Sequence, residues 1–211
     1  MVLRLMNRVL DLAHRSDTER YIAEALPWVH EAGNPYFDWI FGGPEAALDN
    51  LEAWMKRPSS EVSIQRTRIL LQGDRVVGGF LALGGEDLQR CIKADTLALL
   101  SAVKGEARRA LLQRMAAVRD LFPRVAADEF YLSKMGVASD LRQRGVGRQV
   151  VKEFIAAGLG AKFRRFRLNV HQGNVPALAL YRSSGFHVVH QSTSSQAKMT
   201  YLSMLREIDI E

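Results

Sequence analysis

The apolar positions along the N-terminal part of the chain follow strand and helix periodicities in turn. Residues 8–13 alternate in the manner of a short strand, and Asp17 is placed to cap a helix running over 18–32. A second helix is predicted over 45–56, where apolar residues recur at helical spacing. An aromatic-rich connector over 33–44 separates the two helices. The chain therefore begins with a strand followed by two helices.

The middle of the chain changes from strand to helix patterns. Residues 62–72 and 75–83 are rich in β-forming residues, and the Gly-Asp pair between them predicts a hairpin. The stretch 86–122 lacks strong turn signals and carries apolar residues at spacings of three and four. It predicts two helices, the second of them ended by Pro123.

The C-terminal part predicts further alternation. We expect strands over 130–137 and 163–170, a helix from about Val146, a short helix over 175–184, and closing strands over 186–191 and 198–205. This order belongs to a mixed α/β (α+β) fold. The stretch 86–122 would then be a helical insertion between the third and fourth strands of a single domain spanning 1–211.

Composition narrows the class of protein. The chain has 211 residues, of which 47% are hydrophobic and 25% charged, as in an average folded domain, and this excludes disordered and collagen-like chains. The single cysteine, Cys91, cannot form an internal disulfide or supply a paired zinc site, which predicts a reducing, cytoplasmic setting. No apolar run is long enough to span a membrane, and arginines interrupt the first ten residues, so we expect neither a membrane segment nor export.

The charge balance points to an anionic ligand without identifying it. A formal net charge of +6 suits nucleic acid, an anionic membrane surface or a phosphate-rich small molecule. Arginines in 86–122 keep a nucleic-acid-binding protein open as an alternative, although a solvated helix face explains them more simply. His187 and His190 lie three apart on a predicted strand and would face opposite sides, so no metal is expected.

A glycine-containing turn lies between the predicted strand 130–137 and the helix after it. Gly145 and Gly147 stand at the start of that helix, where unpaired N–H groups and partial positive charge favour an anion. The segment lacks the Lys-Ser/Thr of a P-loop and the third glycine of a dinucleotide fingerprint. It predicts a phosphate site of another kind, or an ordinary tight turn.

A second motif covers the predicted helix 175–184. Asn174 is a natural N-cap, Pro176 is tolerated in the first turn, and Gly185 is placed to end the helix. Asn174, Ala177 and Tyr181 follow at i, i+3 and i+7 and therefore share one face. That face would leave room for a slender ligand, whereas the simpler interpretation makes Tyr181 a core residue of a capped helix.

Together the two motifs resemble the GNAT superfamily of N-acetyltransferases. The resemblance is loose over 8–83, where only the order of elements agrees, and close over 129–205. The matching residues are Arg142, Gly145 and Gly147 in the first motif, and Asn174, Ala177, Leu180, Tyr181, Gly185 and Phe186 in the second. It implies a central, mostly antiparallel splayed sheet flanked by helices. The helical insertion 86–122 departs from the compact family pattern.

The resemblance also implies acetyl-CoA as cofactor. Its pyrophosphate would lie on backbone N–H groups at the helix start, near basic side chains, and its pantetheine arm would follow the end of the strand 130–137. The expected cofactor-binding residues are Met135, Val137, Arg142, Gln143, Arg144, Gly145, Val146, Gly147, Arg148, Asn174, Ala177 and Tyr181.

The implied chemistry is direct attack of a neutral amine on the thioester. Tyr181 would protonate the departing thiolate, and Glu129 would act as the general base, with Asp128, Ser133 and His171 as fallback bases. A solvated carboxylate at a strand edge is the simpler interpretation of Glu129.

The acceptor would be a small-molecule or peptide amine. The aromatic connector, with Tyr36, Phe37, Trp39 and Phe41, would overhang its pocket and favour a small or partly apolar amine. A homodimer is compatible with this scheme. Besides nucleic-acid binding, a catalytically silent CoA-binding sensor is the alternative function.

Overall fold

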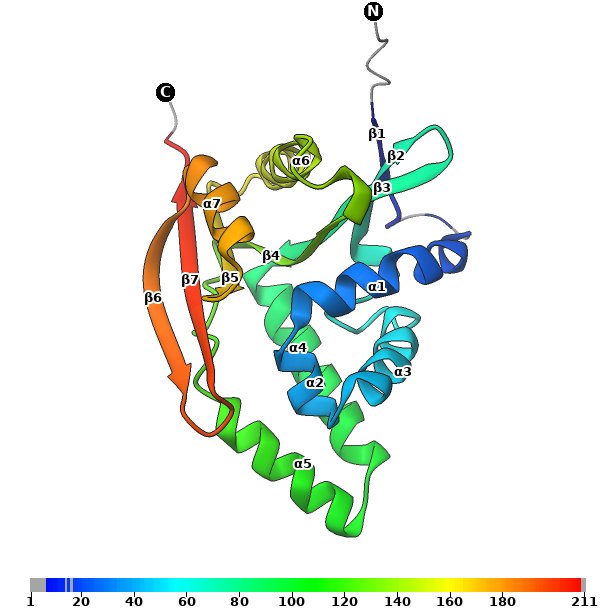
Figure 1. Cartoon of the computed structure of the whole chain (residues 1–211), viewed down its shortest axis with the longest axis vertical. Helices are drawn as coiled ribbons and strands as arrows, with labels where there is room; N and C mark the ends of the chain where they lie inside the picture. The colour runs from blue at the N-terminus through cyan, green and yellow to red at the C-terminus, as the bar shows by residue number, and fades with distance from the viewer. Residues whose placement is uncertain (1–6, 14, 16, 210–211) are drawn as a thin grey trace, which may run out of the picture.

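The structure is a computed structural model that describes residues 7–13, 15 and 17–209. The strands of the described part form one seven-stranded sheet in the order β1-β2-β3-β4-β5-β7-β6 (Figure 1). The strands are β1 (Arg8–Asp11), β2 (Thr67–Gln72), β3 (Arg75–Gly84), β4 (Glu129–Val137), β5 (Arg165–His171), β6 (His187–Ser194) and β7 (Met199–Glu207). The helices are α1 (Ile22–Gly33), α2 (Tyr36–Phe41), α3 (Pro44–Met55), α4 (Gly85–Ala102), α5 (Gly105–Val118), α6 (Val146–Gly160) and α7 (Val175–Ser183), with short 3-10 helices η1 (Thr18–Tyr21), η2 (Ile64–Arg66) and η3 (Ser139–Leu141).

The sheet is antiparallel except at its centre, where β4 and β5 run parallel. Their pairing covers only four positions, from Glu129 opposite Arg165 to Leu132 opposite Leu168. Beyond these positions β4 continues beside β3, and β5 continues beside β7. The two central strands therefore diverge, which confirms the expected mostly antiparallel, splayed sheet.

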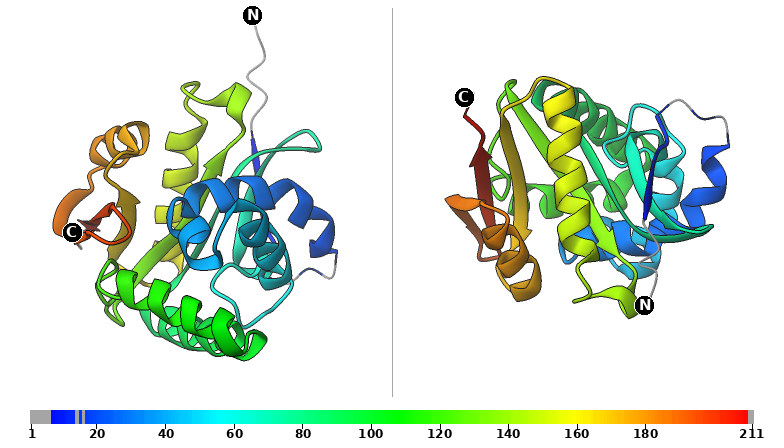
Figure 2. Two further views of the ribbon diagram at one scale, coloured as in Figure 1. Left: turned by 60° about the horizontal axis from the view of Figure 1, so that its bottom comes forward. Right: turned by 90° about the horizontal axis from the view of Figure 1, so that it is seen from above.

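The two faces of the sheet carry separate hydrophobic cores. Neighbouring side chains on a strand point to opposite faces, so Ile69 and Leu71 of β2 join the core under α1, α2 and α3, whereas Leu70 joins the core under α6 and α7. Figure 2 shows α6 lying across one face, with α1 on the other. The helices thus hold the divergent strands from both sides.

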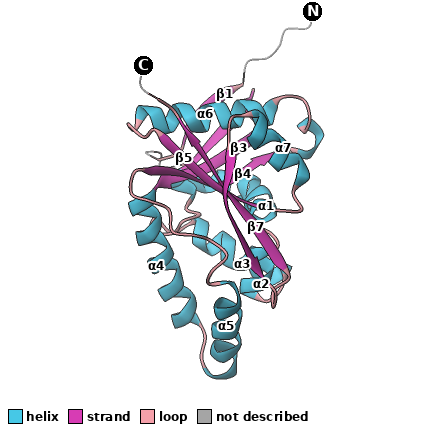
Figure 3. Ribbon diagram, turned by 90° about the vertical axis from the view of Figure 1, so that its left-hand side faces the viewer, coloured by secondary structure: helices cyan, strands magenta, loops and turns pink. Residues whose placement is uncertain are grey.

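The helical segment between β3 and β4 is present as expected. It forms α4 and α5, and α5 lies at the far end of the molecule from α6 (Figure 1, Figure 3). Cys91 of α4 is buried beside Leu88 in a small cluster, and burial raises the pKa of its thiol. Helix α5 ends at Val118, before Pro123, so the proline does not end it.

Two local predictions are wrong, each because a side chain has another partner. Asp17 does not cap a helix with its side chain, since its carboxylate pairs with Arg15 and Arg20 at 2.7 and 2.9 Å. The strand expected from 62 begins only at Thr67, because Ser63 caps the 3-10 turn η2. The aromatic residues of the connector form the short helix α2.

A β-bulge overturns the expected orientation of two histidines. On β6, His187 pairs with Leu205 and His190 with Ser203, and the register shifts between them. Leu205 and Ser203 are two positions apart on β7 and therefore share a face. The extra residue brings His187 and His190 onto the same face, contrary to simple alternation.

The contact of α6 with the sheet predicts that adding a methyl group at two glycines of this helix will change protein stability very differently. A Cβ on Gly158 would lie 2.4 Å from the Phe166 ring and 2.7 Å from the Phe130 ring, whereas a Cβ on Gly160 meets nothing within 4 Å. We expect Gly158→Ala to lower the free energy of unfolding by about 1–3 kcal/mol, because it overpacks the core. Gly160→Ala should leave that energy unchanged or slightly higher. Urea unfolding of the two variants is the measurement, and equal midpoints would contradict this packing.

Candidate active site

A cavity of about 740 Å³ opens where β4 and β5 diverge. Its walls come from the end of β4, the end of β5, helices α1 and α7, and the turn before α6. Most residues expected to bind the cofactor line it, namely Met135, Val137, Arg142, Gln143, Gly145, Gly147, Arg148, Asn174, Ala177 and Tyr181. Arg144 and Val146 are not among its lining residues, and the Val146 side chain is instead buried in the core under α6.

The turn before α6 presents the start of that helix to the cavity. Gly145 is the N-cap at φ +89°, a left-handed conformation that suits glycine. In the described part of the chain, no side chain caps this helix, and its first turn contains no acidic residue. The unpaired N–H groups there favour an anion.

Gly147 has a different role, in close packing. A Cβ at this position would lie 3.1 Å from Leu180 and 3.6 Å from Met135. The absence of a side chain therefore lets the start of α6 approach both α7 and β4.

Ion pairs hold this turn in place. Arg142 Nη2 lies 2.6 Å from Glu31 Oε2 on α1, and Arg142 Nε donates to the Val137 carbonyl at 3.3 Å. Arg75 of β3 pairs with Asp140 at 2.7 Å. Arg142 thus links the turn to α1, whereas Arg148 lines the cavity with no described acidic side chain paired to it.

Helix α7 has the caps that its sequence indicates. Asn174 Oδ1 accepts a hydrogen bond from the Ala177 N–H at 3.2 Å, and Gly185 follows the helix at φ +84°. Tyr181 is buried, and its Oη lies 3.8 Å from Met135 Sδ across the cavity wall. Burial raises the pKa of Tyr181, so this phenol holds its proton at neutral pH.

A second bulge turns Ser133 toward a carboxylate that the sequence reasoning missed. Leu81 pairs with Lys134 and Ala82 with Leu132, so Ser133 is the extra residue on β4. Its Oγ donates to Glu61 Oε1 at 2.5 Å, and Lys134 Nζ lies 3.2 Å from the same oxygen. No local pattern marks Glu61, since it lies in the irregular segment between α3 and η2.

The ionisation of Glu61 is set by these neighbours. Burial acts to raise its pKa, but the Lys134 ammonium and the hydrogen bonds from Ser133 and Lys134 outweigh burial and hold that pKa below its usual range. Glu61 is therefore a carboxylate at neutral pH.

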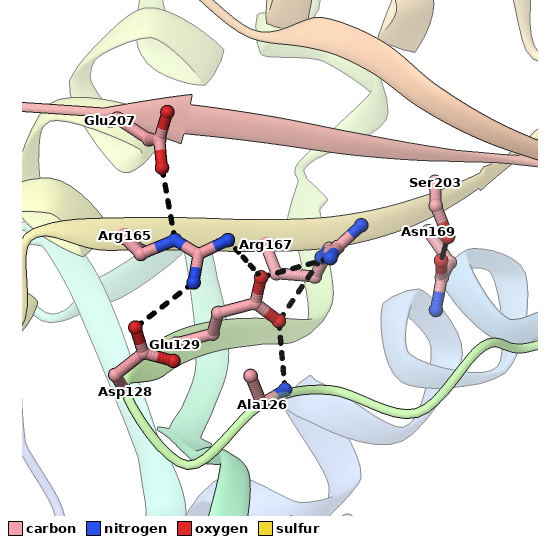
Figure 4. Close-up of polar contacts among 8 residues, drawn as sticks. All are labelled: Ala126, Asp128, Glu129, Arg165, Arg167, Asn169, Ser203 and Glu207. Carbon is pink, nitrogen blue, oxygen red and sulfur yellow. Dashed lines mark hydrogen bonds and ion pairs between the residues drawn. The ribbon is translucent and has the colours of Figure 1, made fainter.

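Glu129 is not brought to the cavity. It opens β4 at the end that pairs with β5, about 26 Å along the strand from Val137. Figure 4 shows its fully buried carboxylate bound by Arg167 at 2.9 and 3.2 Å, by the Ala126 N–H at 2.9 Å, and by Arg165 at 3.3 Å. Its oxygens are engaged in holding β4 to β5.

The fallback bases differ in position. Asp128 pairs with Arg165 at 2.9 Å beside Glu129, outside the cavity. Ser133 and His171 both line the cavity. His171 Nδ1 accepts the Gly173 N–H at 3.2 Å, which places the proton of the neutral ring on Nε2.

The cavity also contains residues that the sequence reasoning did not identify. Trp28 and Glu31 reach it from α1, Asn34 from the residue after that helix, and Asn169 from β5. Asn169 Nδ2 donates to the Tyr131 hydroxyl at 3.1 Å, and its Oδ1 accepts from Ser203. These side chains come from segments far apart in the chain, so no local spacing could have grouped them.

The described residues contain no cluster of three or more potential metal ligands. None of the helices in this part of the chain has the length and apolar character needed to cross a membrane.

Comparison with known proteins assigns the family. The family model described as "Acetyltransferase (GNAT) family" matches residues 34–186, which include both motifs and most of the cavity walls. The chain belongs to the GNAT acetyltransferase family. The splayed sheet, the turn before α6 and helix α7 are therefore the elements of a GNAT domain. No curated protein matches the sequence.

Solved structures agree with this GNAT fold. An N-acetyltransferase from Staphylococcus aureus Mu50 superimposes with a TM-score of 0.65 at 17% identity, covering 94% of this chain and 99% of that one. A crystal structure described as an acetyltransferase gives a TM-score of 0.61 at 18% identity, covering 96% and 100%. The ribosomal-protein-S18-alanine N-acetyltransferase from Escherichia coli gives 0.53 at 14%, covering 98% and 96%. At these identities the similarity is one of fold.

The ion pairs of Glu129 predict a structural effect rather than a catalytic one. Glu129→Gln removes the charge that two arginines share, so the free energy of unfolding should fall by about 3 kcal/mol. Asp128→Asn, which removes an exposed partner of Arg165, should cost less than about 1 kcal/mol because solvent screens that pair. Chemical unfolding of both variants tests this. A Glu129→Gln protein of unchanged stability but greatly reduced turnover would return Glu129 to the mechanism.

Proposed function

We propose that this protein is an N-acetyltransferase that transfers the acetyl group of acetyl-CoA to an amine. The observation that carries the proposal is one continuous cavity at the strand divergence, with an uncapped helix start at one part of its wall and the phenol of Tyr181 at another. The same cavity can therefore bind an anion and supply a proton.

The turn before α6 fits the phosphates of acetyl-CoA. Gly145 and Gly147 leave the backbone at the helix start without side chains, and the first turn of α6 carries the partial positive charge of the helix dipole. Arg148 adds a full positive charge at the cavity wall. Arg142 contributes by fixing the turn against α1, through its pair with Glu31.

The edge of β4 fits an extended, amide-containing arm. From Ser133 to Val137 this edge lies beyond the pairing with β5. Unpaired backbone N–H and C=O groups there can bind a pantetheine chain as a further strand would. When bound, acetyl-CoA would supply the acetyl group that is transferred.

Proton movement is assigned to two side chains. Tyr181 keeps its proton at neutral pH and is placed to supply it at Oη. Glu31 lines the cavity but is paired with Arg142, whereas Glu61 contacts the cavity wall through the Ser133 hydroxyl. We therefore assign Glu61, rather than Glu129, the uptake of the amine proton. Ser133 can relay that proton, because its hydroxyl both donates and accepts.

The acceptor in this proposal is an amine on a small molecule or a peptide. One similar structure is named for a ribosomal-protein alanine as its acceptor, and a peptide terminus is therefore included. The expected cytoplasmic location and homodimer stay predictions.

The left-handed turn predicts a loss of cofactor binding in one glycine variant. Gly145→Ala places a Cβ where φ is +89°, so the turn must rearrange and its N–H groups must move. We expect acetyl-CoA affinity to fall by at least about tenfold. Gly73→Ala is the matched control, since Gly73 also has positive φ and open surroundings but does not line the cavity. Calorimetry with acetyl-CoA measures both variants, and unchanged affinity of folded Gly145→Ala would remove this turn from the cofactor site.

If the phenol of Tyr181 is the proton donor, its removal should lower turnover without lowering acetyl-CoA affinity. Tyr181→Phe keeps the ring and removes the proton donor, so acetyl-CoA affinity should persist while turnover falls by roughly ten- to a thousandfold. Release of free thiol over a panel of amines measures turnover. Equal turnover in both proteins would make Tyr181 a core residue, and absence of turnover in the wild type with intact binding would favour a silent CoA-binding module.

A further inference from the structure

The large cavity is lined from both faces of the sheet, because it opens at the gap between β4 and β5. Helix α7 and the turn before α6 line it on one face, and α1 lines it on the other. The side chains of β5 divide in the same way. Leu168 and Val170 point into the core under α6 and α7, so Asn169 and His171 point to the face of α1. The proposed cofactor elements and these two polar residues therefore meet the gap from opposite faces.

Asn169 stands at the narrow end of this gap. It is the first residue of β5 beyond the last pair with β4, and Ser133 is the corresponding residue of β4. Both residues line the cavity, and Ser133 donates to Glu61, to which the uptake of the amine proton is assigned. The gap here is little wider than the spacing of paired strands, about 5 Å. An amine at Ser133 therefore has the Asn169 side chain as a near neighbour.

The amide of Asn169 is held in one orientation. Its Oδ1 accepts from Ser203 Oγ, and its Nδ2 donates to the Tyr131 hydroxyl at 3.1 Å. Figure 4 shows the amide nitrogen pointing away from Ser203. A primary amide has two N–H donors, and Tyr131 alone among the described residues accepts from this one. One oriented N–H is thus available to a ligand in the cavity.

His171 offers a second donor two residues further along the strand. Because its Nδ1 accepts the Gly173 N–H, the neutral ring carries its proton on Nε2, and no described residue accepts that proton. The ring packs edge to face against Tyr201 with centroids 5.3 Å apart, which fixes its plane. In this tautomer the ring has no free lone pair, so it suits a hydrogen-bond donor better than the fallback base of the sequence prediction.

The aromatic connector does not line the large cavity. Its residues Tyr36, Phe37 and Phe41 line a second, smaller cavity of about 90 Å³ among α2, α3, α4 and α5, together with Trp54 and Asp95. These helices gather on the side of the molecule away from α6 (Figure 1, Figure 3). The expected aromatic overhang is therefore not observed at the large cavity, where β5 presents polar groups instead.

We propose that Asn169 and His171 bind a carbonyl oxygen next to the reactive amine, so that the acceptor is an α-amino acyl compound, either a free amino acid or the first residue of a peptide. This assignment rests on the proposed function. A carbonyl oxygen has two lone pairs and a carboxylate has two oxygens, so either group can accept from both donors. An alkyl amine without this oxygen leaves the donors unpaired once it displaces water, and an unpaired donor costs affinity.

Equilibrium binding tests this assignment without requiring turnover. The full chain, saturated with CoA, is titrated by calorimetry with alaninamide and with 3-methylbutan-2-amine, in which an isopropyl group replaces the carboxamide. We expect alaninamide to bind roughly tenfold more tightly, because only alaninamide pairs with the two donors. Alanine is the third ligand. Tighter binding of alanine than of alaninamide supports a free amino acid as the acceptor, and the reverse order supports a peptide.

Three variants locate the preference for alaninamide over the alkyl amine. Asn169→Asp keeps the size and the acceptor for Ser203 but removes the donor, so it should abolish the preference while CoA affinity stays unchanged. His171→Phe keeps the packing against Tyr201 and should reduce the preference by roughly threefold or more. Asn50→Asp is the same change on α3, outside both cavities, and should retain the preference in full. The ratio of the two affinities, compared across proteins, cancels the different basicities of the two amines.

The outcomes separate this assignment from the proposed function. Failure of alaninamide to bind, equal affinity for alaninamide and the alkyl amine, or a preference that survives both Asn169→Asp and His171→Phe would overturn the assignment. A preference that depends on Asn169, without acetyl transfer to any amine, would overturn only the proposed function.

Discussion

The short parallel contact between β4 and β5 is the constraint on which the rest of the site depends. Pairing stops at Leu132 and Leu168, because each strand then follows its other neighbour. At the paired end, Glu129 binds Arg165 and Arg167 from β5 and clamps the strands together. A clamp at one end and separate partners at the other hold the cavity open, where an uninterrupted ladder would have closed it.

The helices on the two faces can then approach the opening from opposite sides. Helix α1 packs directly on β4 at Gly136, where a Cβ would lie 2.4 Å from Trp28. That close approach brings Glu31 to Arg142 and so ties the turn before α6 to the other face. The glycines of β4 and α6 thus have complementary effects, since Gly136 admits α1 and Gly147 admits α7.

The electrostatics of the two cavities differ. The large cavity combines a helix start, Arg148 and a protonated phenol, which suits a polyanionic cofactor and a leaving group that needs a proton. The small cavity combines aromatic rings with Glu61 and Asp95, whose cationic partners are Lys134 and Arg57. The helical segment between β3 and β4 supplies Asp95 to the small cavity, whereas the lining of the large cavity comes from other elements.

The sequence by itself determined the features that depend on a few neighbouring residues. The Asn174 cap, the glycine that ends α7, the hairpin between β2 and β3, and the helices of 86–122 follow from local sterics and periodicity. The two motifs that place the chain in its family are of this kind.

Tertiary structure decided whatever depends on a partner distant in the chain. β-Bulges change the face of the sheet to which Ser133 and His190 point. The alternation of residues in the sequence cannot reveal where such bulges lie. Glu129 has the residue type of a base, but its carboxylate oxygens are bound by Arg167 and Arg165. Glu61 contacts Ser133 only because the segment after α3 folds back onto β4. The energy of a buried carboxylate depends on the charges and donors around it, and those are set by packing.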